Sequence, residues 1–112
     1  MKQWAEAEKQ VREGLKQDPQ HILCNLTLAS LLLRRECSVT EMTDVFLCLQ
    51  RLDKAVTPDT PLDNVTDWIV LGATYEALLG HDLQATALLA RVERLWPNHP
   101  GAARVREAMR TK

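Results

Sequence analysis

One histidine and one cysteine in this sequence have the types and the spacing of a pair of metal ligands. His21 and Cys24 lie three residues apart, which would place both on one face of a helix. A structural zinc site needs about four such ligands, and Cys37 and Cys48 lie far from this pair along the chain. The ligand set is incomplete, so we expect neither a metal nor any other cofactor.

Cys37 is the cysteine with the most suggestive neighbours for nucleophilic chemistry. It follows Arg34, Arg35 and Glu36, and nearby cations lower the pKa of a thiol. A lone loop cysteine still lacks the base that a thiol nucleophile needs. The sequence also lacks a glycine-rich phosphate loop and a pair of carboxylates placed for acid and base roles. We therefore expect that the protein is not an enzyme and has no small-molecule substrate.

Composition and charge favour an ordinary folded domain. Of 112 residues, 46% are hydrophobic and 26% are charged, and the formal net charge of −1 provides no field to attract nucleic acid or an anionic membrane. No window approaches the roughly 20 apolar residues that span a bilayer, and the polar first residues do not resemble a signal peptide. The odd number of cysteines indicates free thiols in a reducing compartment. We expect a cytoplasmic protein.

Helical periodicity accounts for nearly the whole chain. Apolar residues recur every three to four positions, and short breaks with turn residues separate the periodic stretches. This pattern predicts an all-α fold of six helices in one domain over residues 1–112. The expected helices span about 3–16, 19–35, 38–56, 60–79, 82–96 and 99–110.

Capping and turn signals place several of these boundaries. Asp18 followed by Pro19 predicts the start of the second helix, because Asp caps helices and Pro suits their first position. Ser38 and Glu41 have the spacing of a capping box and predict the start of the third. Gly80 predicts the end of the fourth helix, since glycine readily adopts a left-handed conformation.

The second half of the chain contains a repeat motif. Trp68, Leu71, Gly72 and Tyr75 are followed by Gly80, Ala85, Leu89 and Pro97. This stretch resembles the tetratricopeptide repeat (TPR) family, whose pattern has a Trp, a Leu-Gly pair, a Tyr, a small residue, a bulky residue and a final Pro. A weaker copy, in which Asn25 stands in place of the Trp, includes Ala7, Val11, Pro19, Leu28, Ala29 and Leu32.

The resemblance implies an α-solenoid of about three antiparallel helix pairs. Two such helices approach closely where one presents a small residue, which Gly72 and Ala85 would provide. The repeat-like units are 2–18 (half a repeat), 19–57 and 61–97, followed by a capping helix at 99–110, and their spacing exceeds the family period of about 34 residues. Because the chain begins in mid-repeat, we expect either the C-terminal part of a longer array or a short array whose first face is covered by another chain.

TPR domains bind other proteins, so the resemblance implies a protein-interaction or scaffold module that holds a peptide or amphipathic helix in a concave groove. The alternative for the leucines of this groove is packing against a missing first helix. Some members clamp a carboxylate with lysine, asparagine and arginine, but the corresponding positions here hold Leu26, Ser30, Ile69 and Ala73, and Arg34 alone could pair with a carboxylate. By position in the pattern, the groove would be lined by Leu23, Leu26, Ser30, Leu33, Arg34, Thr66, Ile69, Ala73, Glu76 and Ala77.

Two other kinds of function remain open. Related helical arrays bind RNA, and the last helix carries a basic patch of Arg104, Arg106, Arg110 and Lys112, although it lacks aromatic residues on which bases could stack. The first helix could instead mediate self-association as a homodimer, with Trp4 and Val11 at the contact.

Overall fold

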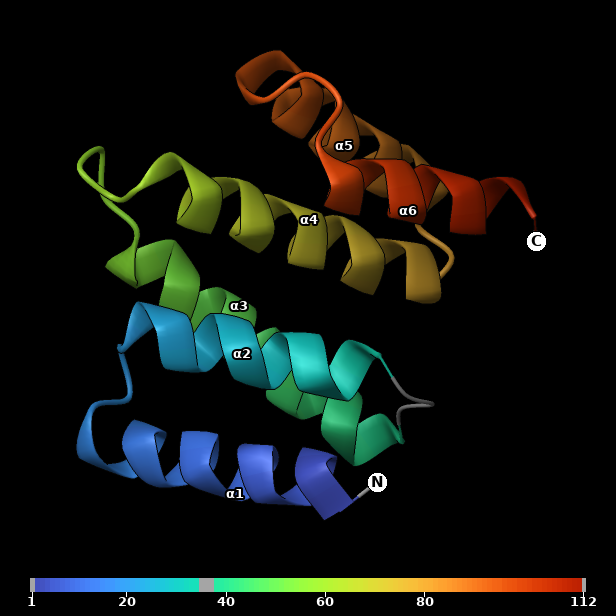
Figure 1. The fold of residues 1–112 in the computed structure, drawn as a ribbon. Coiled ribbons are helices and arrows are strands. Elements are labelled where there is room, and N and C mark those ends of the chain that lie inside the picture. The colour runs from blue at the N-terminus through green and yellow to red at the C-terminus, as the bar shows by residue number, and fades with distance from the viewer. Residues whose placement is uncertain (1, 35–37, 112) are drawn as a thin grey trace. The chain divides into compact units, whose positions relative to one another are not determined.

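The protein is an all-helical chain in its computed structural model, which describes residues 2–34 and 38–111, with side chains from residue 5 onward (Figure 1). These described residues contain no strand, so the predicted all-α class is confirmed. No helix among them is long and apolar enough to span a bilayer. The helices are α1 (Lys2–Gln17), α2 (Ile22–Leu33), α3 (Val39–Ala55), α4 (Leu62–Leu78), α5 (Asp82–Leu95) and α6 (Pro100–Arg110).

The chain divides into two compact units, Met1–Thr60 and Pro61–Lys112. The first unit contains α1, α2 and α3, and the second contains α4, α5 and α6.

The second helix begins later than Asp18 and Pro19 predict. It starts at Ile22, and its cap is His21, whose Nδ1 accepts a hydrogen bond from the Cys24 backbone N–H at 3.2 Å. The Asp18 carboxylate accepts instead from the Gln20 N–H at 3.2 Å. Asp18 therefore stabilises the turn between α1 and α2, and an imidazole supplies the acceptor that was expected from the carboxylate.

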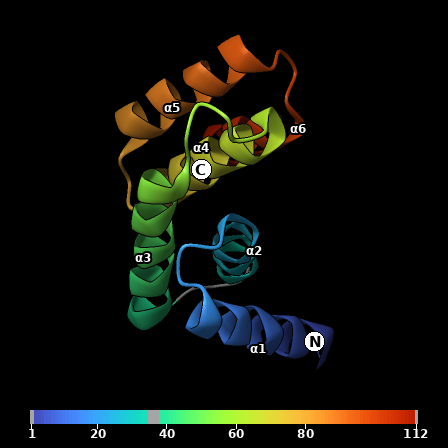
Figure 2. The ribbon, with the colours of Figure 1, turned by 90° about the vertical axis from the view of Figure 1, so that its left-hand side faces the viewer.

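In the first unit, α2 packs against both α1 and α3. Figure 2 looks almost along α2 and shows α1 and α3 on different sides of it. The contact with α1 is close at Gly14, where a Cβ atom would lie 3.0 Å from the Cys24 sulfur. Buried side chains from all three helices fill this unit: Leu15, Leu26, Leu28, Ala29, Leu32, Val45, Cys48 and Leu52.

The start of α3 confirms the predicted capping box. The Ser38 hydroxyl accepts from the Glu41 N–H at 3.2 Å, and the Glu41 carboxylate accepts from the Ser38 N–H at 3.1 Å. These two bonds satisfy backbone donors that have no partner within the helix.

In the second unit, α4 and α5 form a helix pair joined by a tight turn, and α6 packs against both of them. Gly80 has a φ of 81°, the left-handed conformation predicted for it at the end of α4. Ala85 is fully buried, as a small contact residue should be. Gly72 is less constrained, because a Cβ there would make an ordinary 3.6 Å contact with Leu88.

The core of the second unit lies where α4, α5 and α6 meet. Its buried members are Ile69 and Ala73 from α4, Leu89 and Val92 from α5, and Ala102 from α6. Trp68 packs against this cluster from one side while remaining partly accessible.

His99 fixes the start of α6. Its side chain is buried, and its Nδ1 accepts from the backbone N–H groups of Gly101 at 3.0 Å and Ala102 at 3.4 Å. The ring of Trp96 meets it edge to face, with the centroids 4.8 Å apart. An unprotonated Nδ1 thus caps α6 while the ring packs beside the tryptophan.

Candidate functional site

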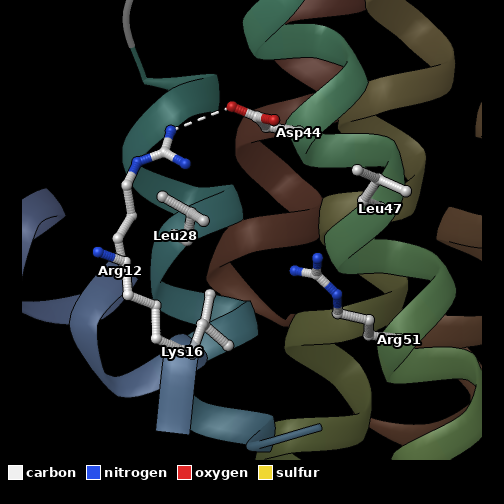
Figure 3. A pocket seen from close by; sticks show the side chains of 7 residues that line it. Arg12, Lys16, Leu28, Asp44, Leu47 and Arg51 are labelled. Atoms are coloured by element: carbon white, nitrogen blue, oxygen red, sulfur yellow. Dashed lines mark hydrogen bonds and ion pairs between the residues drawn. The ribbon is translucent and has the colours of Figure 1, made fainter. Parts of the chain in front are cut away.

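A depression opens on the first unit between α1 and α3, with α2 beneath it (Figure 3). Its volume is about 260 Å³. About one turn of α1 and about two turns of α3 face each other across it, because the lining residues recur at helical spacing on both helices. The lining consists of Arg12, Leu15, Lys16, Leu28, Asp44, Leu47 and Arg51.

Leucines form the apolar part of the depression. Leu15 and Leu28 are buried, with 8% and 2% of their surface exposed, so they belong to the packed interior at the floor. Leu47 on α3 differs, since 39% of its surface is exposed on the wall. A large apolar side chain is therefore available to a partner at this position.

Arg12 crosses the depression and joins its two walls. Its Nε donates to Glu8 at 2.9 Å, one turn earlier on α1, and its Nη2 donates to Asp44 on α3 at 3.1 Å, the pair drawn in Figure 3. Partial burial opposes the charged guanidinium, but the hydrogen bonds and charges of these two carboxylates outweigh it and raise the pKa of Arg12. Arg12 is thus a satisfied cation that bridges α1 and α3.

Two further cations border the depression without such partners. Neither Lys16 nor Arg51 forms an ion pair within the part of the chain that the structure describes. Figure 3 shows the Arg51 guanidinium extending from α3 toward the space between the helices. Beside an apolar floor, such a group can donate paired hydrogen bonds to a carboxylate.

Cys48 lies next to this site but is not available for chemistry. It is fully buried, and this burial raises the pKa of its thiol to about 11, with Arg51, Asp44 and Arg12 making smaller contributions. The thiol is therefore protonated at neutral pH and inert as a nucleophile. Cys24 is also a free thiol and is partly accessible, whereas Cys37 lies outside the described residues.

The structure corrects the groove expected on α4. Ile69 is only 4% exposed and Ala73 is fully buried, and both pack in the core with α5 and α6. The physical reason is that α6 packs against α4 as well as α5, so the face proposed for a ligand is covered from within the unit. Thr66 and Ala77 are likewise buried, while Glu76 is half-buried and lies 2.7 Å from His81 Nδ1.

The groove residues expected on α2 do not form one surface either. Leu26 is buried with 7% exposure, whereas Leu23 is 56% exposed. Ser30 and Leu33 are half-buried, and Arg34 is exposed. Leu26 therefore contributes to packing, and Leu23 is the accessible apolar side chain among the five predicted here.

The basic patch of the last helix is largely neutralised. Arg106 donates to both carboxylate oxygens of Glu93 on α5 at 2.7 Å, and Arg110 lies 3.5 Å from Glu107. Among the described residues of α6, Arg104 is the one arginine without an ion pair. Few cations remain for a phosphate backbone, which weakens the case for RNA binding.

The expected self-association contact involves the start of α1. The side chain of Trp4 lies outside what the structure describes, and Val11 is half-buried. The same holds for Lys112 of the basic patch, which is also outside the described residues. Self-association through the first helix thus stays a prediction.

Sequence reasoning missed the residues that line the depression, although their spacing is a usable signal. Arg12 and Lys16 are one turn apart on α1, and Asp44, Leu47 and Arg51 follow one face of α3. The signal shows which residues share a helix face, but not that the two faces lie across α2 from each other.

Neither a cluster of metal ligands nor a similarity to known proteins indicates what this site binds. Within residues 2–34 and 38–111, no three His, Cys, Asp or Glu side chains are grouped to hold a metal ion. A scan against protein-family models gives no match to this chain, and comparisons with curated proteins and with solved structures give none.

Proposed function

We propose that this chain is a protein-interaction module of the TPR-like kind, and that it binds a partner at the depression between α1 and α3. The observation on which this rests is an accessible apolar wall at Leu47 beside two cations, Lys16 and Arg51, that have no ionic partner among the residues the structure describes. Exposed apolar side chains rimmed by charged ones are typical of protein-binding surfaces.

The size of the depression favours a side chain of a partner protein over a small molecule. Sites for small molecules typically measure about 300–1,000 Å³ and enclose most of their ligand. The present depression has about 260 Å³ and is bordered by solvent-accessible residues such as Lys16 and Leu47. It suits one or two side chains projecting from a peptide or helix that lies across α1 and α3.

The packing of the second unit supports the repeat class. The small residue Ala85 and the bulky residue Leu89 of the motif are both fully buried, and the turn glycine Gly80 is left-handed. The motif positions Trp68, Leu71 and Tyr75 are half-buried around them. These are the roles that the TPR pattern assigns to such residues, and proteins of this kind act by binding other proteins.

The proposal can be tested with peptides selected from a random-sequence display library panned against the wild-type chain. Selected peptides are then measured by fluorescence anisotropy against Leu47→Asp and against Leu83→Asp. Leu83 is a matched control, because it is 86% exposed and lies on α5 in the other unit. We expect Leu47→Asp to weaken binding on the order of tenfold or more, as for an apolar contact residue, and Leu83→Asp to leave it unchanged.

Two results would count against the site. Equal affinities for wild type and Leu47→Asp would place the binding surface elsewhere, and a wild-type chain that selects no peptide would argue against an interaction module. Circular dichroism of each variant checks that helical content is retained.

A further inference from the structure

Building on the proposed interaction site, we propose that its occupant is an acidic amphipathic segment of a partner protein, which places an Asp or Glu side chain between Lys16 and Arg51 and an apolar side chain against Leu47. This inference names the chemistry of the partner and rests on the proposed function.

The charge balance of the depression is the first argument. Its lining holds three cations, Arg12, Lys16 and Arg51, against the single carboxylate of Asp44. Arg12 is already satisfied by Asp44 and by Glu8, and no other carboxylate among the described residues pairs with Lys16 or Arg51. A ligand carboxylate would complete the balance, whereas a cationic segment would be repelled.

The arrangement of the two available cations is the second argument. Lys16 is in the last turn of α1, and Arg51 is on α3 on the other wall, so a carboxylate between them would be held from both sides. Arg51 is half-buried near the buried Leu15 and Leu28. Ion pairs that are shielded from water in this way are stronger than those on an open surface.

The apolar wall separates this partner from other anions. Leu47 is on α3 one turn before Arg51, so a helix or extended peptide that pairs with Arg51 also covers Leu47. A phosphate or a nucleic-acid backbone would satisfy the cations but leave the leucine in water. An acidic side chain with an apolar neighbour satisfies both features.

The inference is tested by comparing two double variants that remove the same charge. Lys16→Gln/Arg51→Gln removes both available cations from the depression. Lys9→Gln/Lys54→Gln also removes one cation from α1 and one from α3, but at exposed positions outside it. A random-peptide display library is panned against the wild type, and the selected peptides are measured against both variants.

We expect the selected peptides to be enriched in Asp and Glu adjacent to Leu, Ile or Met. Their affinity should fall on the order of tenfold for each cation removed from the depression, and little for the control pair. Binding to the wild type should also weaken as salt is raised. If Arg51→Gln reduces helical content, the exposed single variant Lys16→Glu provides the same comparison.

The outcomes separate this inference from the proposed function. Selected peptides without acidic enrichment, which depend on Leu47 but bind both double variants equally, would overturn the acidic partner and leave the interaction site standing. No selected peptide at all would overturn both. Light scattering that shows wild-type self-association, lost in the Lys16→Gln/Arg51→Gln variant, would identify the occupant as a second copy and also overturn the inference.

Discussion

The two units of this chain contain three helices each, but these helices pack in different ways. In the second unit α6 packs against both α4 and α5, so the three helices share one core. In the first unit α1 and α3 each pack against α2, and the space between them stays open as the depression. A third helix that fills the space between two others produces a sealed core, whereas two helices flanking a central one leave a depression on the surface.

The same contrast appears at one position of the repeat pattern. Trp68 in the second unit is an apolar residue that packs against the core cluster. Asn25, which the repeat resemblance would align with Trp68, is fully buried in the first unit, with its Nδ2 donating to Pro19 O at 3.0 Å and His21 O at 2.9 Å. One unit therefore uses this position for apolar packing, and the other uses it to fasten the turn between α1 and α2.

The largest expected effect comes from placing a charge in the sealed core. Ile69→Glu should unfold the second unit, because an unpaired carboxylate among Leu89 and Val92 costs several kcal/mol and removes an apolar contact as well. We expect the far-UV circular dichroism signal to fall sharply. Leu83→Glu introduces the same residue at an 86% exposed position and should keep the wild-type signal. Retained helicity and cooperative melting in Ile69→Glu would contradict the core assignment.

The helices and most of their ends were predictable from the sequence, because those signals are local. Apolar periodicity places every helix, the Ser38 and Glu41 pair forms its capping box, and Gly80 is left-handed as predicted. The predicted start of α2 was wrong because two side-chain acceptors compete for the role of helix cap. The Asp18 carboxylate accepts a hydrogen bond within the turn, and His21 caps the helix. Local sequence gives both residues as possible caps and does not decide between them.

The candidate site was not predictable in the same way. The family resemblance predicts that Ile69 and Ala73 line a groove, but α6 covers the face on which they lie. That cover is a contact between parts of the unit that are distant in sequence. The spacing of the lining residues shows only that they share a face on each helix. They become a site only because α2 positions α1 and α3 at a distance that Arg12 and Asp44 can bridge. Tertiary packing thus decides which charged residues face one another.

A second prediction tests the fastening role of Asn25. Asn25→Ala removes two hydrogen bonds to the α1–α2 turn and should lower the free energy of unfolding by about 1–2 kcal/mol. The loss is limited because the Asn25 Oδ1 atom is buried without a hydrogen-bond partner, and the substitution removes that atom too. Chemical denaturation provides the measurement, with the exposed neighbour Thr27→Ala as control. No loss of stability would show that the turn holds without this side chain.

A third prediction concerns the cap that seals the second unit. His99→Ala should reduce the free energy of unfolding by about 1 kcal/mol, since Gly101 and Ala102 lose the acceptor for their backbone N–H groups. His99→Asn keeps a short side-chain acceptor and should recover much of this loss. Thermal denaturation of the two variants compares them directly. Equal destabilisation by both would assign the effect to lost packing against Trp96 rather than to capping.

The smallest expected effect concerns the ion pair between Arg106 and Glu93. Arg106 donates two hydrogen bonds to Glu93, joining α6 to α5, and these bonds lower the pKa of the Glu93 carboxyl. A carboxyl with a lower pKa in the folded state stabilises the fold above its unfolded pKa of about 4.3. That contribution is then lost as the pH falls through the folded pKa. Glu93→Gln should therefore destabilise the protein at neutral pH but not in acid.

Water screening sets the size of this effect. The side chains of Glu93 and Arg106 are 38% and 36% exposed, so the pair contributes at most about 1 kcal/mol. Urea denaturation of wild type and Glu93→Gln across the acid range measures the difference, with the exposed Glu6→Gln as a control. A gap that persists below the pKa of the carboxyl would mean that Glu93 acts through packing. If the stability difference between the two proteins disappears in acid, the ion pair between Glu93 and Arg106 contributes to holding α6 on the apolar core. Arg12, in contrast, bridges two helices that have an open depression between them.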